Sequence, residues 1–263
     1  MVTEIRLSER STSEISINTE QVFSFSITMQ LGMQHADSIW MSRALSGSDS
    51  RKDMKTNYLV HEEMYVQARQ AGWEGWGGNE RMSKPILVER FLAMGGCPTR
   101  GRLLELGCGE GHHCRAFYLH GFEVTGVDIS ETAIAWAREK AQLADIAGEY
   151  VVADLTAASL ELTERYDVVI DGNCLHCIIG NDRTTFLNHV YRLLSENGVF
   201  FVSSLCSKDG NSHHTYKDGY TYRCIPSKEN LVSELEEAGF EVRNVEVYER
   251  NTSNHITVYA VKA

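Results

Sequence analysis

The sequence predicts an α/β protein in which a doubly wound, seven-stranded and mostly parallel sheet ends in a C-terminal antiparallel hairpin. Three observations predict this fold. From about residue 100 onward, short apolar segments alternate with segments of helical periodicity, which is typical of parallel strands joined by covering helices. The first apolar segment runs into a glycine-rich turn at residues 107–111. The last two apolar segments are separated only by a short polar turn, which suits a closing hairpin.

The composition narrows the classes of function. The 263 residues include 25 basic and 36 acidic side chains, a net charge of -11, and no segment gathers the basic residues into a stripe. This balance disfavours nucleic acid as a partner. The N-terminus lacks the apolar core of a secretory signal, and no run of roughly 18 uncharged apolar residues is present. We therefore expect a cytoplasmic protein with no membrane segment, in which the seven cysteines, an odd number, are free thiols.

The chain divides into an extension and a compact domain. Residues 1–53 are rich in Ser and Thr and contain one segment, 23–29, that alternates apolar and polar residues like a strand. We expect this extension to be peripheral or partly disordered and not needed for the chemistry. The compact domain is expected over residues 54–263, and residues 54–96 are expected to form an N-terminal helical cap on it.

The elements of the compact domain follow in order. A helix is expected at 59–71, before an aromatic and glycine-rich turn at 72–78, and a second helix begins near Ser83 and Pro85 and stops at Gly95 and Gly96. Apolar runs predict strands near 102–107, 122–127, 149–153, 167–172, 197–204, 241–248 and 254–262. Amphipathic segments predict helices near 111–120, 131–146, 183–194 and 228–238. The long polar connection at 206–227 is expected to be a lid over the ligand or a disordered excursion.

The glycine-rich turn is the first candidate for a ligand site. Gly107, Gly109 and Gly111 permit positive φ angles and a close approach of the backbone around Cys108. The next helix would direct its free N–H groups toward an anionic group there. A dinucleotide site would need a third glycine at position 112, which is His112, whereas Glu105 two residues before the turn suits a ligand that also carries an ammonium group.

Two aspartates extend this site along the edge of the predicted sheet. Asp128 ends the second strand, 21 positions beyond Gly107, where a carboxylate can accept both hydroxyls of a ribose. Asp154 ends the third strand, and the carboxyl ends of parallel strands meet at one edge. A nucleoside between these two acids, with an amino-acid tail over the glycines, describes S-adenosylmethionine.

Four segments carry a family resemblance: "LLELGCGEG", "VTGVDIS", "VVADL" and "YDVVIDGNCLHCI". In order and spacing they resemble the signature segments of class I S-adenosylmethionine-dependent methyltransferases of the small-molecule branch, over about residues 80–263. The resemblance implies a Rossmann-like methyltransferase fold and S-adenosyl-L-methionine as the cofactor. By the resemblance, Glu105 and Gly107 hold the methionine end, Asp128 the ribose, and Ile129, Asp154 and Leu155 the adenine.

The fourth strand ends in polar residues where the methyl acceptor would lie. Asp171 and His176 are the candidate catalytic residues, and Asn173 is a candidate for the acceptor pocket. His176 could remove a proton from the acceptor; in the alternative interpretation, its imidazole only hydrogen-bonds the backbone. The nearby cysteines and histidines lack the paired spacing of a structural zinc site, so no metal is expected.

Two aromatic segments are expected to build the rest of the acceptor pocket. The cap contributes Tyr65, Trp73 and Trp76, although both tryptophans could instead be ordinary packing residues. The long connection contributes His213, Tyr216 and Tyr220.

The sequence thus favours transfer of a methyl group to O, N or S of a small metabolite or natural product. The first alternative is an RNA or protein methyltransferase, which the acidic balance and the absence of an "NPPY"-like segment after the fourth strand disfavour. A nicotinamide-dependent oxidoreductase is disfavoured by His112 in place of a glycine. A module that binds the cofactor without catalysis stays open, as does a homodimer.

Overall fold

The structure is a computed structural model that describes residues 54–76 and 85–262, all within one compact unit. The predicted N-terminal extension at 1–53, including its strand at 23–29, lies outside the described residues, as does the helix start at Ser83. None of the helices in the described ranges combines the length and the apolar character needed to cross a membrane.

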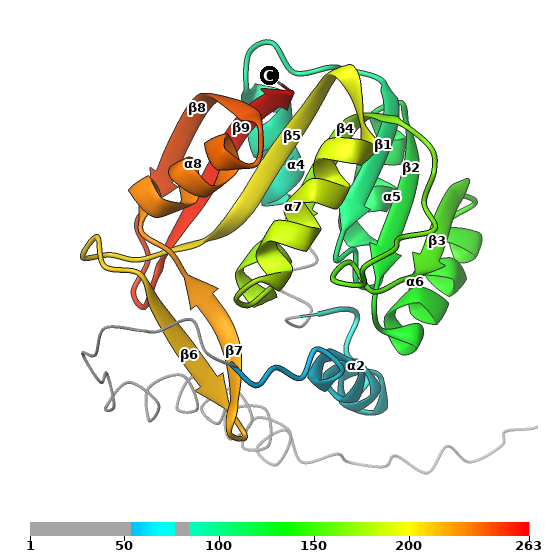
Figure 1. Cartoon of the computed structure of the whole chain (residues 1–263). Helices are drawn as coiled ribbons and strands as arrows, with labels where there is room; N and C mark the ends of the chain where they lie inside the picture. Colours follow the sequence, from blue (N-terminus) through cyan, green and yellow to red (C-terminus); the bar gives the residue numbers. More distant parts are fainter. Residues whose placement is uncertain (1–53, 77–84, 263) are drawn as a thin grey trace, which may run out of the picture. The chain divides into compact units, whose positions relative to one another are not determined.

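The centre of the domain is a seven-stranded sheet with the order β3-β2-β1-β4-β5-β9-β8 (Figure 1). Its strands are β1 (Gly101–Leu106), β2 (Phe122–Asp128), β3 (Gly148–Val152), β4 (Tyr166–Gly172), β5 (Leu194–Cys206), β8 (Phe240–Tyr248) and β9 (Asn254–Lys262). The strands β3, β2, β1, β4 and β5 pair in parallel, whereas β9 is antiparallel to both β5 and β8. The predicted fold class is therefore confirmed, including the closing hairpin.

Helices cover both faces of this sheet, as expected for a doubly wound fold. The helices are α2 (Val60–Gln70), α4 (Ile86–Ala93), α5 (His112–Leu119), α6 (Glu131–Leu143), α7 (Asp182–Leu193) and α8 (Lys228–Glu237), with a short 3-10 helix, η2 (Leu175–Cys177). Consecutive residues of β1 separate the two layers: Leu103 packs in the core with α4, α5 and α6, whereas Leu104 packs in the core with α7 and α8.

Aromatic side chains dominate the first of these cores. The ring of Phe91 meets Phe117, Phe122 and Phe201 edge to face, at centroid distances of 5.3, 6.0 and 5.4 Å. Burial of each such ring contributes roughly 1.5–3 kcal/mol to the free energy of unfolding. This packing holds α4, the second helix of the 54–96 segment, against β2 and β5.

The connection at 206–227 has regular secondary structure in place of the expected disordered excursion, and its expected role as a lid stays a prediction. It contains a β-hairpin of β6 (His213–Lys217) and β7 (Tyr220–Ile225), which forms a second, two-stranded sheet. The turn consists of Asp218 and Gly219, with φ angles of 52° and 82°. Two consecutive positive φ angles are what a two-residue hairpin turn requires, and Asp-Gly is a favoured sequence for it.

The strand order reverses between β1 and β4, which are hydrogen-bonded neighbours with helical connections leading away in opposite directions. In open α/β sheets, ligands bind outside the carboxyl ends of the strands at such a reversal. Figure 1 shows that α2 and the β6–β7 hairpin lie at this edge. The fold therefore brings the glycine-rich turn, the end of β4, the cap and the hairpin together.

Candidate active site

The glycine-rich turn after β1 has the conformation that its sequence predicts. Gly107, Gly109 and Gly111 have φ angles of 65°, 56° and 73°, which side-chain-bearing residues rarely adopt. A Cβ atom at Gly107 would lie 2.6 Å from the Cβ of Cys174, and one at Gly111 would lie 2.7 Å from the ring of Tyr150. Glycine is thus required in this turn by the positive φ angles. At Gly107 it is also required by the close approach of Cys174, which follows β4.

Glu105 lies beneath this turn and is almost fully buried. Its Oε2 accepts hydrogen bonds from the backbone N–H of Cys114, at 3.0 Å, and from the Cys114 thiol. Its Oε1 lies 2.8 Å from Nδ1 of His113. The carboxylate therefore ties β1 to the first turn of α5, where a negative charge is favourable. Its predicted contact with the ammonium group of a ligand stays a prediction.

Asp128 joins the two loops that would surround a nucleoside. The backbone N–H of Gly109 donates to Oδ2 of Asp128, and that of Ser130 donates to Oδ1, both at 2.9 Å. Burial raises the pKa of Asp128 to about 6. Each carboxylate oxygen can accept a second hydrogen bond, so Asp128 retains the capacity to bind two ribose hydroxyls.

The other predicted cofactor residues lie at the same edge in different environments. Cys108 is buried, and its backbone N–H bonds to the carbonyl of Val127, so only its main chain faces the edge. The backbone N–H of Ala153 donates to the carbonyl of Asp128, which brings Asp154 beside the end of β2. Asp154 is exposed, whereas the side chain of Leu155 is buried in the core with α7. Ile129 is half-buried.

At the end of β4, Asp171 shapes the turn that carries the predicted acceptor site. Its Oδ1 accepts hydrogen bonds from the backbone N–H groups of Cys174 and Leu175, at 2.6 and 2.9 Å. Its Oδ2 is buried with no hydrogen-bond partner among the described residues, and burial raises the pKa of Asp171 to about 6. This geometry supports a positioning role for the carboxylate at the start of η2; its predicted catalytic role stays a prediction.

His176 lies in η2 and is buried, with 6% of its surface exposed. Its Nδ1 lies 3.5 Å from the hydroxyl oxygen of Ser204 on β5, at the limit of a hydrogen bond. Both interpretations of this imidazole, base and positional, stay predictions.

The cap helix α2 covers the glycine-rich turn. The hydroxyl of Tyr65 occupies the space that a Cβ at Gly109 would need. The ring of Tyr65 meets that of Trp76 at 5.0 Å, and Trp73 and Trp76 pack against the cluster formed by Tyr65, Ala68, Ala133 and Trp136. The tryptophans thus pack between the cap and α6, and the predicted pocket role of Tyr65, Trp73 and Trp76 stays a prediction.

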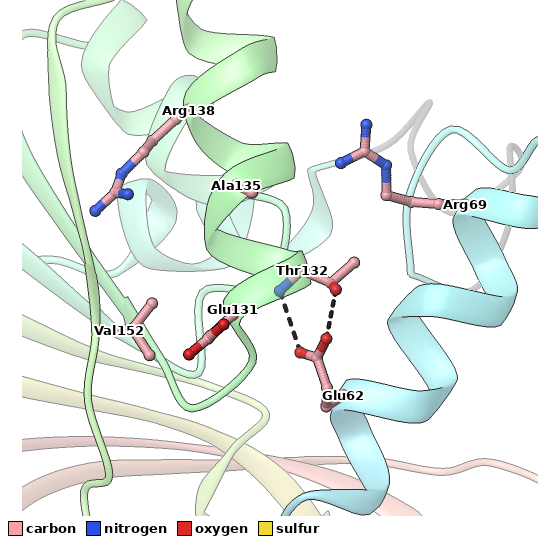
Figure 2. Close-up of a pocket in the computed structure, with 7 residues that line it drawn as sticks. All are labelled: Glu62, Arg69, Glu131, Thr132, Ala135, Arg138 and Val152. Carbon is pink, nitrogen blue, oxygen red and sulfur yellow. Dashed lines mark hydrogen bonds between the residues drawn. The ribbon is translucent and has the colours of Figure 1, made fainter.

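Hydrogen bonds hold this cap in place. The sequence analysis did not predict them. Glu62 accepts hydrogen bonds from the Ser130 hydroxyl, at 2.6 Å, and from the backbone N–H of Thr132, at 3.1 Å. Figure 2 shows Glu62 reaching from α2 to Thr132 at the N-terminus of α6. On the other side, the Tyr58 hydroxyl donates to Asp182 at 2.7 Å and accepts from the N–H of Ile179. No local sequence signal marks these residues, because their partners lie on distant elements.

The hairpin meets the cap through Tyr222, which lies on the same strand as Tyr220. The ring of Tyr222 stacks on His61 at a centroid distance of 5.7 Å, and its hydroxyl contacts the Met64 sulfur. Tyr216 and Tyr220 are 55% and 40% exposed, and His213 is exposed as well. The predicted pocket role of these three residues stays a prediction. The half of β7 that carries Tyr222 and Thr221 makes the contacts with α2 and the segment before it.

The cysteines behave as the sequence predicts. All seven are free, with Cys108, Cys114 and Cys206 buried. Burial raises the pKa of the Cys108 thiol to about 11, so it is protonated and unreactive at neutral pH. In the described parts of the chain, no group of three or more His, Cys, Asp or Glu residues is arranged to hold a metal ion.

Sequence comparison shows which known proteins this part of the chain resembles. Residues 104–202 match the family model described as "Methyltransferase domain". A ubiquinone biosynthesis O-methyltransferase from Rhodopseudomonas palustris (strain BisB5) is 31% identical over 109 residues, which cover 41% of this chain and 42% of that enzyme. The chain spans about half or less of the length of the first curated relatives that it matches.

Solved structures share the fold. A Burkholderia thailandensis 1,6-didemethyltoxoflavin-N1-methyltransferase, crystallised with its namesake ligand and S-adenosylhomocysteine, superimposes with a TM-score of 0.63 and 21% identity, over 77% of this chain and 87% of that one. The [4+2]-cyclase SpnF superimposes with a TM-score of 0.60 and 17% identity, over 80% of this chain and 97% of that one. Residues 104–202 therefore match a methyltransferase domain, and the described part of the chain shares its fold with solved S-adenosylmethionine-dependent methyltransferases.

Proposed function

We propose that this protein transfers the methyl group of S-adenosylmethionine to an oxygen, nitrogen or sulfur atom of a small metabolite or natural product. The observation that carries the proposal is the position of Asp128, whose buried carboxylate bridges the glycine-rich turn and the start of α6 at the reversal of strand order. The family match and the names of the relatives support the same reaction.

The residues present fit this cofactor. Asp128 offers acceptors for the two ribose hydroxyls, and Gly107 and Gly109 carry no side chains of their own, while Cys174 and the Tyr65 hydroxyl lie against them. Ile129 offers an apolar surface for the adenine beside Asp154. This donor and acceptor set matches a nucleoside that ends in an amino acid better than it matches a pyrophosphate.

The bound cofactor would supply a methyl group that is already activated by its sulfonium. The protein's own residues then align the acceptor and keep water away. The turn held by Asp171 carries Asn173, Cys174 and His176, and Cys174 abuts Gly107 of the glycine-rich turn, which supports this arrangement. The aromatic rings of Tyr65 and Trp76 cover this region from the cap. A proton released by the acceptor would be taken up at the imidazole of His176, if the acceptor requires a base.

The fold alone does not fix the reaction, since a [4+2]-cyclase shares it. Two observations favour methyl transfer to a small molecule over other functions. The cap and the hairpin lie at the site edge and meet through His61 and Tyr222, which favours a small acceptor (Figure 1). The net charge of -11 also disfavours an RNA substrate.

Calorimetric titration with S-adenosylmethionine, S-adenosylhomocysteine and NAD tests the cofactor. We expect binding of the first two and none of NAD; tight NAD binding, or no binding of either methyl-cycle compound, would refute the proposal. A panel of phenols, amines and thiols is then assayed for S-adenosylhomocysteine as product. Binding without turnover on any acceptor would favour the non-catalytic module.

A further inference from the structure

A chain of polar side chains runs from α4 to the end of β4. Nη1 of Arg90 lies 3.0 Å from Nδ1 of His255, at the start of β9. Nε2 of His255 lies 3.0 Å from Oδ1 of Asn173 and 3.3 Å from the hydroxyl oxygen of Ser203. The Arg90 guanidinium also stacks on the ring of Tyr248, at 3.3 Å from its centroid, which holds the first member of the chain in place.

The chemistry of these groups fixes the hydrogen positions. An arginine guanidinium is always protonated and can only donate, so Nδ1 of His255 must be the acceptor. The hydrogen of a neutral imidazole is then on Nε2, which donates to Asn173. Because the amide NH₂ of Asn173 would place two donors face to face with His255, its oxygen must point to His255.

This assignment leaves the amide NH₂ of Asn173 on the side away from His255. No described residue accepts a hydrogen bond from that nitrogen, and Asn173 is only half-buried. The residue has a φ of 70°, a conformation that asparagine tolerates better than most residues. It directly precedes Cys174, which abuts the backbone of Gly107. Asn173 is thus adjacent in the chain to the residue that contacts the glycine-rich turn.

We propose that Asn173 determines acceptor specificity by donating a hydrogen bond to a carbonyl or carboxylate oxygen next to the methylated atom, and that His255 is the residue that positions it. This inference rests on the proposed methyl transfer and specifies its substrate class. A site with a half-buried donor rejects a compound that lacks the matching acceptor, because the donor would lose its solvent partner without a replacement.

Three matched pairs of compounds test the proposal across the three candidate atoms: salicylate and phenol, anthranilate and aniline, and thiosalicylate and thiophenol. Each is titrated into the full-length protein with and without S-adenosylhomocysteine, while the side-chain ¹⁵N amide signal of Asn173 is followed by NMR. We expect the carboxylate member of at least one pair to bind roughly 10-fold tighter and to shift that signal. Equal binding within all three pairs, or no binding by any carboxylate, would overturn the proposal.

Asn173→Asp is the decisive variant, because it keeps an acceptor for His255 while it replaces the NH₂ donor with a charged acceptor. We expect it to abolish the preference for the carboxylate member and to leave the affinity for S-adenosylhomocysteine within about 2-fold. Asn188→Asp, at an exposed position of α7, makes the same change of charge and should leave the preference intact. A preference that survives Asn173→Asp would overturn the proposal.

The positioning role of His255 has its own test. His255→Leu removes the donor that orients the amide, so the preference should fall, whereas His255→Gln retains a donor and should restore part of it. A purely structural role would change stability without separating these two variants. Failure of the proposed methyl transfer is recognised independently, as loss of cofactor binding or of product, neither of which depends on the Asn173 donor.

Discussion

The cofactor half and the acceptor half of the candidate site are built in different ways. The cofactor half, at the ends of β1 and β2, is made of short-range features: three glycines with positive φ and a carboxylate bonded to two backbone N–H groups. The acceptor half combines the end of β4 with α2 and β7, through side-chain contacts such as His61 with Tyr222. The first half is therefore expected to tolerate little change, and the second to vary with its substrate.

The largest effect is expected from Asp128→Ala. The variant removes the acceptor of two backbone N–H groups and of the ribose, and hydrogen bonds to a charged group contribute about 1.5–3 kcal/mol each. We expect the Kd for S-adenosylhomocysteine, measured by calorimetry, to rise roughly 100-fold or more. Glu123→Ala, at an exposed position on the same strand, is the matched control and should leave it unchanged. An unchanged Kd in Asp128→Ala would refute the ribose assignment.

The next largest effect is on stability. Two glycine-to-alanine substitutions separate the cost of backbone strain from the cost of steric contact in the glycine-rich turn. Gly109 has a φ of 56° and touches Tyr65, whereas Gly121 has a φ of 93° with open space around it. We expect Gly121→Ala to lower the free energy of unfolding by about 1 kcal/mol, from conformation alone. Gly109→Ala should cost about 2 kcal/mol or more, because the cap must also move. Urea denaturation measures both, and equal costs would show that the contact with Tyr65 is unimportant.

The difference between the halves also explains what the sequence could predict. The positive φ angles at Gly107 and Gly109 and the place of Asp128 follow from local patterns, because the strand ends and the turn fix them. By contrast, Glu62 meets Thr132 across 70 positions and Arg90 meets His255 across 165. Such contacts depend on how helices pack and leave no periodic signal. The β6–β7 hairpin itself was not predicted, although Asp218 and Gly219 form a recognisable turn signal within the polar segment at 206–227.

The next largest effect is a pH dependence of cofactor affinity, about 10-fold per pH unit. It is expected to arise only in the cofactor half of the site. Burial raises the pKa of Asp128 to about 6, and the ionised carboxylate is the form that accepts both ribose hydroxyls. Affinity for S-adenosylhomocysteine should therefore be constant above about pH 7 and fall roughly 10-fold per unit below pH 6. Asp128→Asn should bind more weakly and lose this dependence. An equal dependence in both proteins would assign the titration to another group.

The smallest effect is expected from a substitution in the cap. We expect it to change the rate at which the cofactor dissociates more than it changes the fold. Glu62 holds α2 to the start of α6 through Ser130 and Thr132, and Ser130 follows Asp128 by two residues, so opening of the cap would uncover the nucleoside site. Glu62→Ala removes these contacts, whose net contribution is about 1 kcal/mol because the groups can bond water instead. Stopped-flow measurement should show dissociation of S-adenosylhomocysteine about 5-fold faster. Glu63→Ala, at the adjacent exposed position, should leave the rate unchanged, and an equal rate in all three proteins would mean that the cofactor leaves without movement of α2.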